Sequence, residues 1–404
     1  MRVTSAKFYK EYAGTVQDLK SKYNHSLMQV SSGKRYEKAA DSPLDYYAGK
    51  KIDNLYNDAQ TKETMIKDVN NRLQQQEAAS RSIHTEMGNI NTKLVTLLNA
   101  PQEGLKSTID TYSSELRMRQ QNMANDMNMQ YENFYVLGGN DATTIPFDMS
   151  ADGQTLTYHH KFAGDSEATN IRMEYQYNTH KDATTGEVIS EGGYTYTLID
   201  KEGNPISGKT EDDAMNELLR AMREQGRMSL GYGNVVNRET LPDTYTGGMN
   251  MVTGLSSDAL RTMSDSEAKS QIRKNMDTSC FGLNARVIKG VENYSSTFID
   301  SDTGVQADRD LMYADLSYSL REMDDSMVRV SDTFRRIGIT TTVLEHVESN
   351  LQTQQDSYQQ EYTDHMGIPL EEAITKMYSD QFAYNAAMQV GSKIMQNSLF
   401  DFVR

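Results

Sequence analysis

The chain has 404 residues, a length that suits about two or three domains of ordinary size. Hydrophobic residues make up only 37% and the mean hydropathy is -0.70, which excludes one large globular core and favours helices that bury a narrow seam. The formal net charge of -16 argues against nucleic acid and anionic membranes as partners, because both need clustered Lys and Arg.

Two further features limit the class of protein. Cys280 is the one cysteine, so no intrachain disulfide is possible, and no histidine lies close in sequence to activate it, so we expect a buried, inert thiol. No apolar run approaches the roughly 20 residues of a membrane-spanning helix. Residues 1–14 lack the hydrophobic stretch that a cleaved secretory signal carries. We therefore expect a protein that is cytoplasmic or exported without cleavage.

The first predicted element is a helix at residues 1–30. Its apolar residues recur at spacings of three and four, namely Phe8, Tyr12, Val16, Leu19, Tyr23, Leu27 and Val30. Ser31 to Gly33 interrupts this pattern. Asp41 or Ser42 can cap a second helix that has Pro43 in its first turn.

The second helix is long and carries a sustained heptad, the pattern of a left-handed coiled coil. Its seam is Ile52, Leu55, Ala59, Lys62, Ile66, Val69, Leu73, Gln76, Ser80, Ile83, Met87, Ile90, Leu94 and Leu97. The three polar members weaken the seam without changing its register. Pro101 and Gly104 end the helix, and a third helix is predicted at about 105–131.

The middle of the chain, from Gly138 to about Gly254, is rich in Gly, Thr, Tyr and Asp. Alternating segments predict strands at 154–162, 170–177 and 193–200. Residues 201–208 predict a turn, and 212–226 predict one amphipathic helix. We therefore expect a mixed domain inserted into a helical one.

Helix returns at about 306 with a second alternating seam. This seam is Tyr313, Leu316, Leu320, Met323, Met327, Val330, Phe334, Ile337, Thr341 and Leu344, and it continues with a small shift through Val347, Leu351 and Tyr358. Gly367 and Pro369 break it. A last helix is predicted from about Pro369 to Ser398.

These elements predict a mainly α fold: an elongated α-helical coiled-coil bundle formed by both chain ends, with an inserted β-rich (α+β) central domain. Seams near both ends need partners, so we expect 52–97 to pair with 313–358 and 1–30 to pair with 370–398. The expected domains are an N-terminal helical half at 1–140, the inserted domain at 141–275, a connecting segment at 276–305 and a C-terminal helical half at 306–404.

The sequence predicts no catalytic, metal or cofactor site, and therefore no enzyme. Gly33-Lys34 lacks the remaining residues of a phosphate-binding loop. His159 and His160 would point to opposite faces of a strand and could not chelate a metal together.

Three segments together resemble a known family. The segment 31–52 (SSGKRYEKAADSPLDYYAGKKI) resembles the SSG-R…DDP region of the flagellin family. The segment 131–147 (YENFYVLGGNDATTIPF) resembles part of hook-associated protein 3, the hook–filament junction protein of that family. The tail 374–404 is similar to the end of flagellar axial proteins. Shorter similarities to the junction protein occur at 1–4, 247–260 and 335–345.

The sequence departs from the family pattern in three places. Ser42 replaces the second Asp of the usual pair, the stretch 148–246 matches no domain that we can name, and the arginine pattern typical of true flagellins is absent around 105–125. The last departure favours a junction protein over a flagellin.

The resemblance implies an extracellular flagellar protein that is exported without a cleaved signal peptide and has no cofactor. Its implied partners are neighbouring copies in a ring, the hook-side junction protein, flagellin and a cytoplasmic flagellar export chaperone. A loop is expected to align the short and long helices through Ser32, Gly33, Lys34, Arg35, Asp41 and Pro43.

Narrow apolar stripes on the terminal helices predict that residues 1–40 and about 365–404 are mobile in the free monomer and become ordered on assembly. The predicted subunit interface is Leu19, Leu27, Val30, Ile374, Met388, Ile394, Leu399, Phe400 and Phe402.

Three alternatives stay open at this point. The chain could be a flagellin that forms the filament itself, its central domain could be a glycan-binding or enzymatic module on a flagellar stem, or it could be a general coiled-coil scaffold. The sequence does not predict the role of 148–246 or the number of subunits.

Overall fold

A computed structural model describes residues 2–99, 106–141, 143–181, 188–224, 246–298 and 305–402. The chain forms two compact units, a terminal unit of Met1–Thr64 with Val347–Arg404 and a central unit of Met65–His346. The predicted fold class, mainly α with an inserted antiparallel sheet, is confirmed. The predicted domain limits 1–140, 141–275, 276–305 and 306–404 stay predictions.

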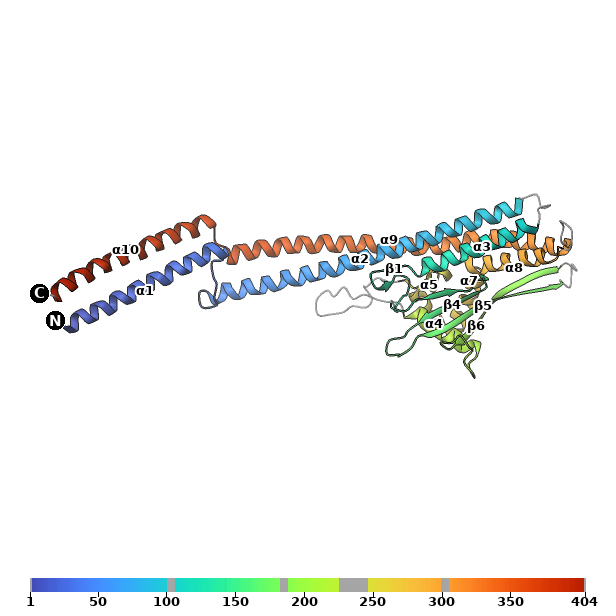
Figure 1. The fold of residues 1–404 in the computed structure, drawn as a ribbon, viewed down its shortest axis with the longest axis horizontal. Helices are drawn as coiled ribbons and strands as arrows, with labels where there is room; N and C mark the ends of the chain where they lie inside the picture. The colour runs from blue at the N-terminus through green and yellow to red at the C-terminus, as the bar shows by residue number, and fades with distance from the viewer. Residues whose placement is uncertain are drawn as a thin grey trace. The chain divides into compact units, whose positions relative to one another are not determined.

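The terminal unit is built from α1 (Arg2–Ser32), the start of α2 (Pro43–Asn99), the end of α9 (Gln306–Met366) and α10 (Leu370–Phe402). Helices α1 and α10 lie side by side (Figure 1). They are antiparallel, because Tyr12 reaches Ala387 whereas Gln29 reaches Lys376. The predicted pairing of the two terminal helices is therefore confirmed.

Helix α2 begins where the sequence predicts, with Pro43 as its first residue. The Ser42 carbonyl accepts the Tyr46 amide at 3.0 Å, and the Ser42 hydroxyl donates to Asp45 at 2.8 Å. Proline suits this first position because its missing N–H has no partner in the first turn.

Helices α2 and α9 also run antiparallel within the central unit. His84 meets Phe334 edge-on with ring centroids 5.7 Å apart, and the Arg81 guanidinium lies 4.7 Å from the same ring. Every predicted α2 seam residue from Ile66 to Leu97 is buried. In the terminal unit the seam is weaker, because Leu55, predicted as a seam residue, is 38% exposed.

The inserted sheet is antiparallel in the order β3-β4-β5-β6. Its strands are β3 (Phe147–Met149), β4 (Thr155–His160), β5 (Thr169–Lys181) and β6 (Val188–Ile199). The three predicted strands correspond to β4, β5 and β6. Helix α4 (Glu211–Arg223) is the predicted amphipathic helix, and a capping box of Thr210 and Asp213 fixes its start.

One prediction of local structure needs correction, and one segment contains a helix that was not predicted. The third helix, α3 (Lys106–Met127), ends four residues before the predicted Tyr131, because a short hairpin of β1 (Gln130–Tyr131) and β2 (Phe134–Tyr135) takes over. The predicted connection 276–305 contains a buried helix, α8 (Cys280–Ser296).

Helix α8 was not predicted. Its less buried residues Arg286, Lys289 and Glu292 recur every three residues, but its buried side includes Asn284 and Gly290, which do not stand out as apolar in the sequence. Three preceding helices were also not predicted, namely α5 (Gly248–Thr253), α6 (Ser257–Thr262) and α7 (Asp265–Asp277).

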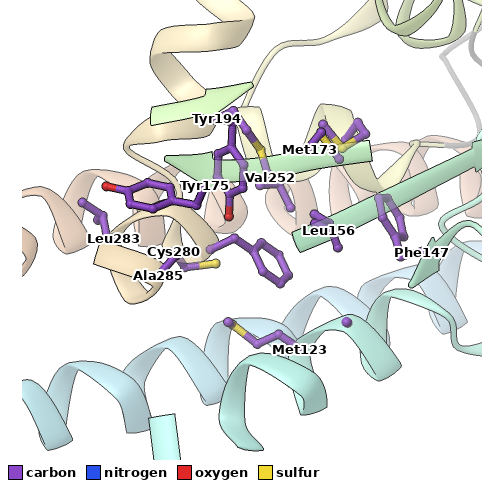
Figure 2. Close-up of a cluster of buried hydrophobic side chains, with 14 of the residues drawn as sticks. Met123, Phe147, Leu156, Met173, Tyr175, Tyr194, Val252, Cys280, Leu283 and Ala285 are labelled. Carbon is purple, nitrogen blue, oxygen red and sulfur yellow. The ribbon is translucent and has the colours of Figure 1, made fainter. Parts of the chain in front are cut away.

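The core of the central unit lies between the sheet and helices α3, α5 and α8 (Figure 2). Met123, Leu156, Tyr194 and Leu283 meet there, each from a different element. Cys280 is buried among them, as predicted, and burial raises the pKa of its thiol to about 12. A buried thiol of this kind stays protonated at neutral pH.

Candidate functional site

The described residues offer little for chemistry. Among them, no group of three or more His, Cys, Asp and Glu side chains is placed to hold a metal ion. No described helix combines the length and the apolar character that crossing a membrane requires. His160 is buried while His159 is partly exposed and hydrogen-bonded to Asn170 at 2.7 Å, so the two rings occupy opposite faces of β4 as predicted.

The candidate site is instead the α1–α10 helix pair. Across it, the Tyr12 hydroxyl donates to the Ala387 carbonyl at 2.7 Å, and the Tyr23 and Tyr384 rings stack with centroids 6.5 Å apart. Ser26 donates to Asp380. Val16, Leu19 and Val30 on the same α1 face are only half-buried, so the pair covers its aliphatic side chains incompletely.

A second apolar stripe on α10 is exposed within the terminal unit except at Ile374, which is half-buried. Leu370, Ile374, Tyr378 and Phe382 follow each other every four residues, which places them along one side of the helix. Leu370 and Tyr378 are each 60% exposed, and Phe382 is 77% exposed. We call these four residues the α10 stripe. It lies away from the contact line because Ala373, Asp380 and Tyr384 face α1 or the interior.

The predicted interface residues fall into three groups. Leu19, Val30 and Ile374 are half-buried, and the first two share the α1 face that carries Tyr12 and Tyr23. Leu27 and Met388 are exposed. The side chains of the others lie outside the described residues, namely Ile394, Leu399, Phe400 and Phe402. Their role in a subunit interface stays a prediction.

The predicted helix-junction motif ties two linkers together. Gly33 has φ +66°, a left-handed conformation that favours glycine. Its carbonyl accepts the Ile368 amide at 3.1 Å, while the Arg35 amide donates to the Met366 carbonyl at 2.6 Å. Lys34 and Gly367 thus form an antiparallel bridge between the linker after α1 and the linker before α10.

Asp41 and Gly49 fix the rest of this junction. The Asp41 carboxylate accepts the Glu37 and Lys38 amides at 3.1 Å each, and the bond from Lys38 is the main cause that lowers its pKa. Gly49 leaves room for the buried Met366, because a Cβ at 49 would collide with that side chain. Ser32 and Pro43 end and begin the flanking helices.

Two motifs of the family resemblance meet at the base of the inserted domain. The Gly248 amide donates to the Leu137 carbonyl at 2.8 Å, and Gly138 bridges to Gly247. Gln76 from the α2 seam donates to a carbonyl in each of the two segments, at Val136 and Thr246. The polar seam position that weakens the heptad is therefore a buried anchor for the two ends of the insertion.

A buried ion pair was missed at the sequence level. Asp315 on α9 is fully buried and accepts the Arg286 Nε at 2.7 Å and the Tyr177 hydroxyl at 2.7 Å. Arg286 also donates to the Ser190 carbonyl at 2.8 Å. Desolvation by burial, with Asp315 nearby, raises the pKa of Tyr177. This network joins β5, β6, α8 and α9. Its one signal in the sequence is the acidic residue Asp315 directly beside the seam residue Leu316.

Comparison with known proteins gives matches among solved structures only. No family model and no curated protein matches the chain. A protein from Vibrio parahaemolyticus assigned as flagellar hook-associated matches with a TM-score of 0.44 and 10% identity, over 81% of this chain and 100% of that chain.

Two further structures match in the same way. FlgL of Xanthomonas campestris has a TM-score of 0.36 and 13% identity, over 79% of this chain and 98% of that chain. Flagellar hook associated protein-3 of Legionella pneumophila has a TM-score of 0.41 and 10% identity, over 78% and 98%. These proteins belong to the family that the motifs resemble. Likeness at this level carries no functional argument, so the proposed function rests on the residues of this chain.

Proposed function

We propose that the chain is a structural adaptor subunit of the bacterial flagellum that joins the hook to the filament. The observation that carries the proposal is the α1–α10 pair, in which Leu370, Tyr378 and Phe382 of the α10 stripe remain exposed in the single chain. The motifs at 31–52, 131–147 and 374–404 support the flagellar assignment, since they resemble that family in the same order along the chain.

The physical basis of assembly is the incomplete burial of the terminal helices. Two antiparallel helices whose aliphatic side chains are only half-buried are marginal in water. A neighbour that covers the α10 stripe would add hydrophobic free energy that the single chain lacks. Head-to-tail contacts of this kind use two different surfaces and propagate as rings or helices.

The proposed partners follow from the same role. Copies of the chain would form a ring, bounded by the hook-side junction protein on one side and flagellin on the other, and an export chaperone would hold the chain before secretion. The protein would act outside the cell. This role requires no catalysis and no cofactor.

The location of the protein tests the proposal directly. Isolated flagella are labelled with an antibody to the inserted domain and viewed by electron microscopy. We expect label only at the hook–filament boundary. Label along the filament would make the chain the filament protein, and absence of label from flagella would end the proposal.

The C-terminal tail offers a second test. We expect Leu399→Asp to be secreted normally but to abolish attachment of the filament. Ser379→Asp, which adds the same charge at an exposed polar position of α10, is the matched control and should leave attachment intact. Normal motility of the Leu399→Asp variant would contradict a role of the tail in assembly.

A further inference from the structure

The four-stranded sheet has two edges, at β3 and β6, where backbone groups face away from neighbouring strands. The Tyr175 amide donates toward β4, to the Gln154 carbonyl at 2.9 Å. Its partner Tyr194 in β6 therefore turns its own N–H and C=O outward. Such outward groups are a ready template for a strand from another molecule.

Helix α7 covers both outward groups of Tyr194 with side chains. The Tyr194 N–H donates to Asp277 Oδ1 at 2.8 Å, and Arg273 Nη1 donates to the Tyr194 carbonyl at 3.5 Å. Because Asp277 and Arg273 are one helical turn apart, they offer an acceptor and a donor to one residue, as a neighbouring strand would. Gly193 permits this approach, since a Cβ there would lie 3.0 Å from Asp277 Oδ2.

The same edge is covered at two further places. Toward one end of β6, Arg286 Nη2 donates to the Ser190 carbonyl at 2.8 Å. Toward the other end, the Ile206 amide donates to the Leu198 carbonyl at 2.9 Å. Ser190, Tyr194 and Leu198 are four residues apart, so these contacts recur along the outward side of the strand.

The opposite edge, at β3, is covered by a single amide. Asn128, just after α3, accepts the Phe147 N–H on Oδ1 at 3.0 Å and donates from Nδ2 to the Phe147 carbonyl at 2.7 Å. One side chain thus satisfies both outward groups of a β3 residue. The arrangement repeats on β3 what Asp277 and Arg273 do together on β6.

We propose that Asn128, Arg273, Asp277 and Arg286 act as substitutes for neighbouring strands and close both edges of the sheet against strand addition by a second copy of this chain. The inference does not depend on the flagellar assignment. It means that the inserted domain is kept out of association through its sheet, which leaves the surfaces of the helices as the route of assembly.

The test removes, in the full-length chain, the side chains that cover each sheet edge, and then measures self-association. The variants are Asn128→Ala for β3 and the pair Arg273→Ala with Asp277→Ala for β6. We expect both to associate at roughly tenfold lower protein concentration than the parent chain by light scattering, with the infrared signature of intermolecular sheet. Exchange of the Phe147 or Tyr194 amide should accelerate by a similar factor.

Two controls separate edge opening from loss of stability. Val287→Ala creates a cavity at a fully buried position of α8 and leaves the edges intact, so it must associate at no lower concentration than the parent chain, even when it is as destabilised as the edge variants. Asp277→Asn keeps an acceptor oxygen for Tyr194 and must also associate like the parent chain. Equal association of Val287→Ala and the edge variants, or edge variants that associate like the parent chain, would overturn the proposal.

Discussion

The terminal and central units differ in how much apolar surface each hides within one chain. In the central unit, side chains from the sheet and from helices α3, α5 and α8 form one continuous buried cluster. Among the described side chains of α1 and α10, Ala373 is the one apolar residue that is buried. The comparison teaches that the central unit is stabilised by its own core, whereas the described parts of the terminal helices bury almost no apolar side chains within one chain.

The largest effect that would sharpen this contrast is expected at the buried ion pair. Asp315→Ala leaves the Arg286 guanidinium in the interior without its carboxylate, so the free energy of unfolding of the central unit should fall by about 3–5 kcal/mol. Chemical denaturation followed by circular dichroism measures this. The double variant Arg286→Met with Asp315→Leu should lose less than the single variant. A loss below about 1 kcal/mol for Asp315→Ala would show that the buried ion pair contributes little to the stability of the central unit.

A smaller change in the free energy of unfolding is expected at Asp277, where substitution should stabilise the central unit. Burial raises the pKa of this carboxyl from 3.8 to about 6, so its charged form destabilises the folded state above pH 6, and this cost disappears as the pH falls toward 3.8. Asp277→Asn should therefore stabilise the central unit at pH 7.5, by about 3 kcal/mol at most. The gain should shrink to nothing near pH 4 in denaturation curves measured across this range. A gain that is independent of pH would show that the charge is not its cause.

In the terminal unit, the close approach of Gly49 and Met366 allows a selective perturbation. Gly49→Ala places a methyl group against the buried Met366 side chain and should destabilise this unit by about 1–3 kcal/mol, without changing the melting of the central unit. Gly14→Ala is the matched control, because a Cβ there meets nothing within 4 Å, and replacing a mid-helix glycine should stabilise α1. Equal effects of both substitutions would contradict the junction packing.

The smallest effect on stability should accompany a large effect on assembly. Phe382→Ser removes the most exposed residue of the α10 stripe, so the free energy of unfolding of the monomer should change by less than about 0.5 kcal/mol. Polymerisation measured by sedimentation should nevertheless weaken at least roughly tenfold, since a buried aromatic contact between chains is lost. Gln389→Ser, at another exposed position of α10, should leave polymerisation unchanged. Unaltered assembly of the Phe382→Ser chain would exclude the stripe as an interface.

Regular helices and their pairing could be predicted from the sequence because heptad spacing records which face is buried. The strands β4 to β6 could be predicted for the same reason, through alternation. Helices α7 and α8 were not predicted, because their buried residues include small and polar ones, such as Asn275, Asn284 and Gly290, that do not stand out as apolar in the sequence. Local patterns therefore identify elements whose buried side is mostly apolar and fail where buried residues are small or polar.

The candidate site could be predicted only in part. Apolar spacing on the last helix predicts Ile374 and Met388 as interface residues, which stays a prediction, whereas the exposed Tyr378 and Phe382 of the α10 stripe were not predicted. Gln76 appears in the sequence only as a weak seam position, because its partners Val136 and Thr246 are distant in the chain. Contacts between remote segments depend on tertiary packing, which spacing alone does not encode.

The most direct test of the central claim is amide hydrogen exchange of the chain as a dilute monomer and after polymerisation. In the monomer, we expect residues 7–32 and 370–393 to exchange at least roughly a thousandfold faster than α8, and to become protected in the polymer while α8 changes little. Terminal helices as protected as α8 in the monomer, or unchanged on polymerisation, would contradict the account.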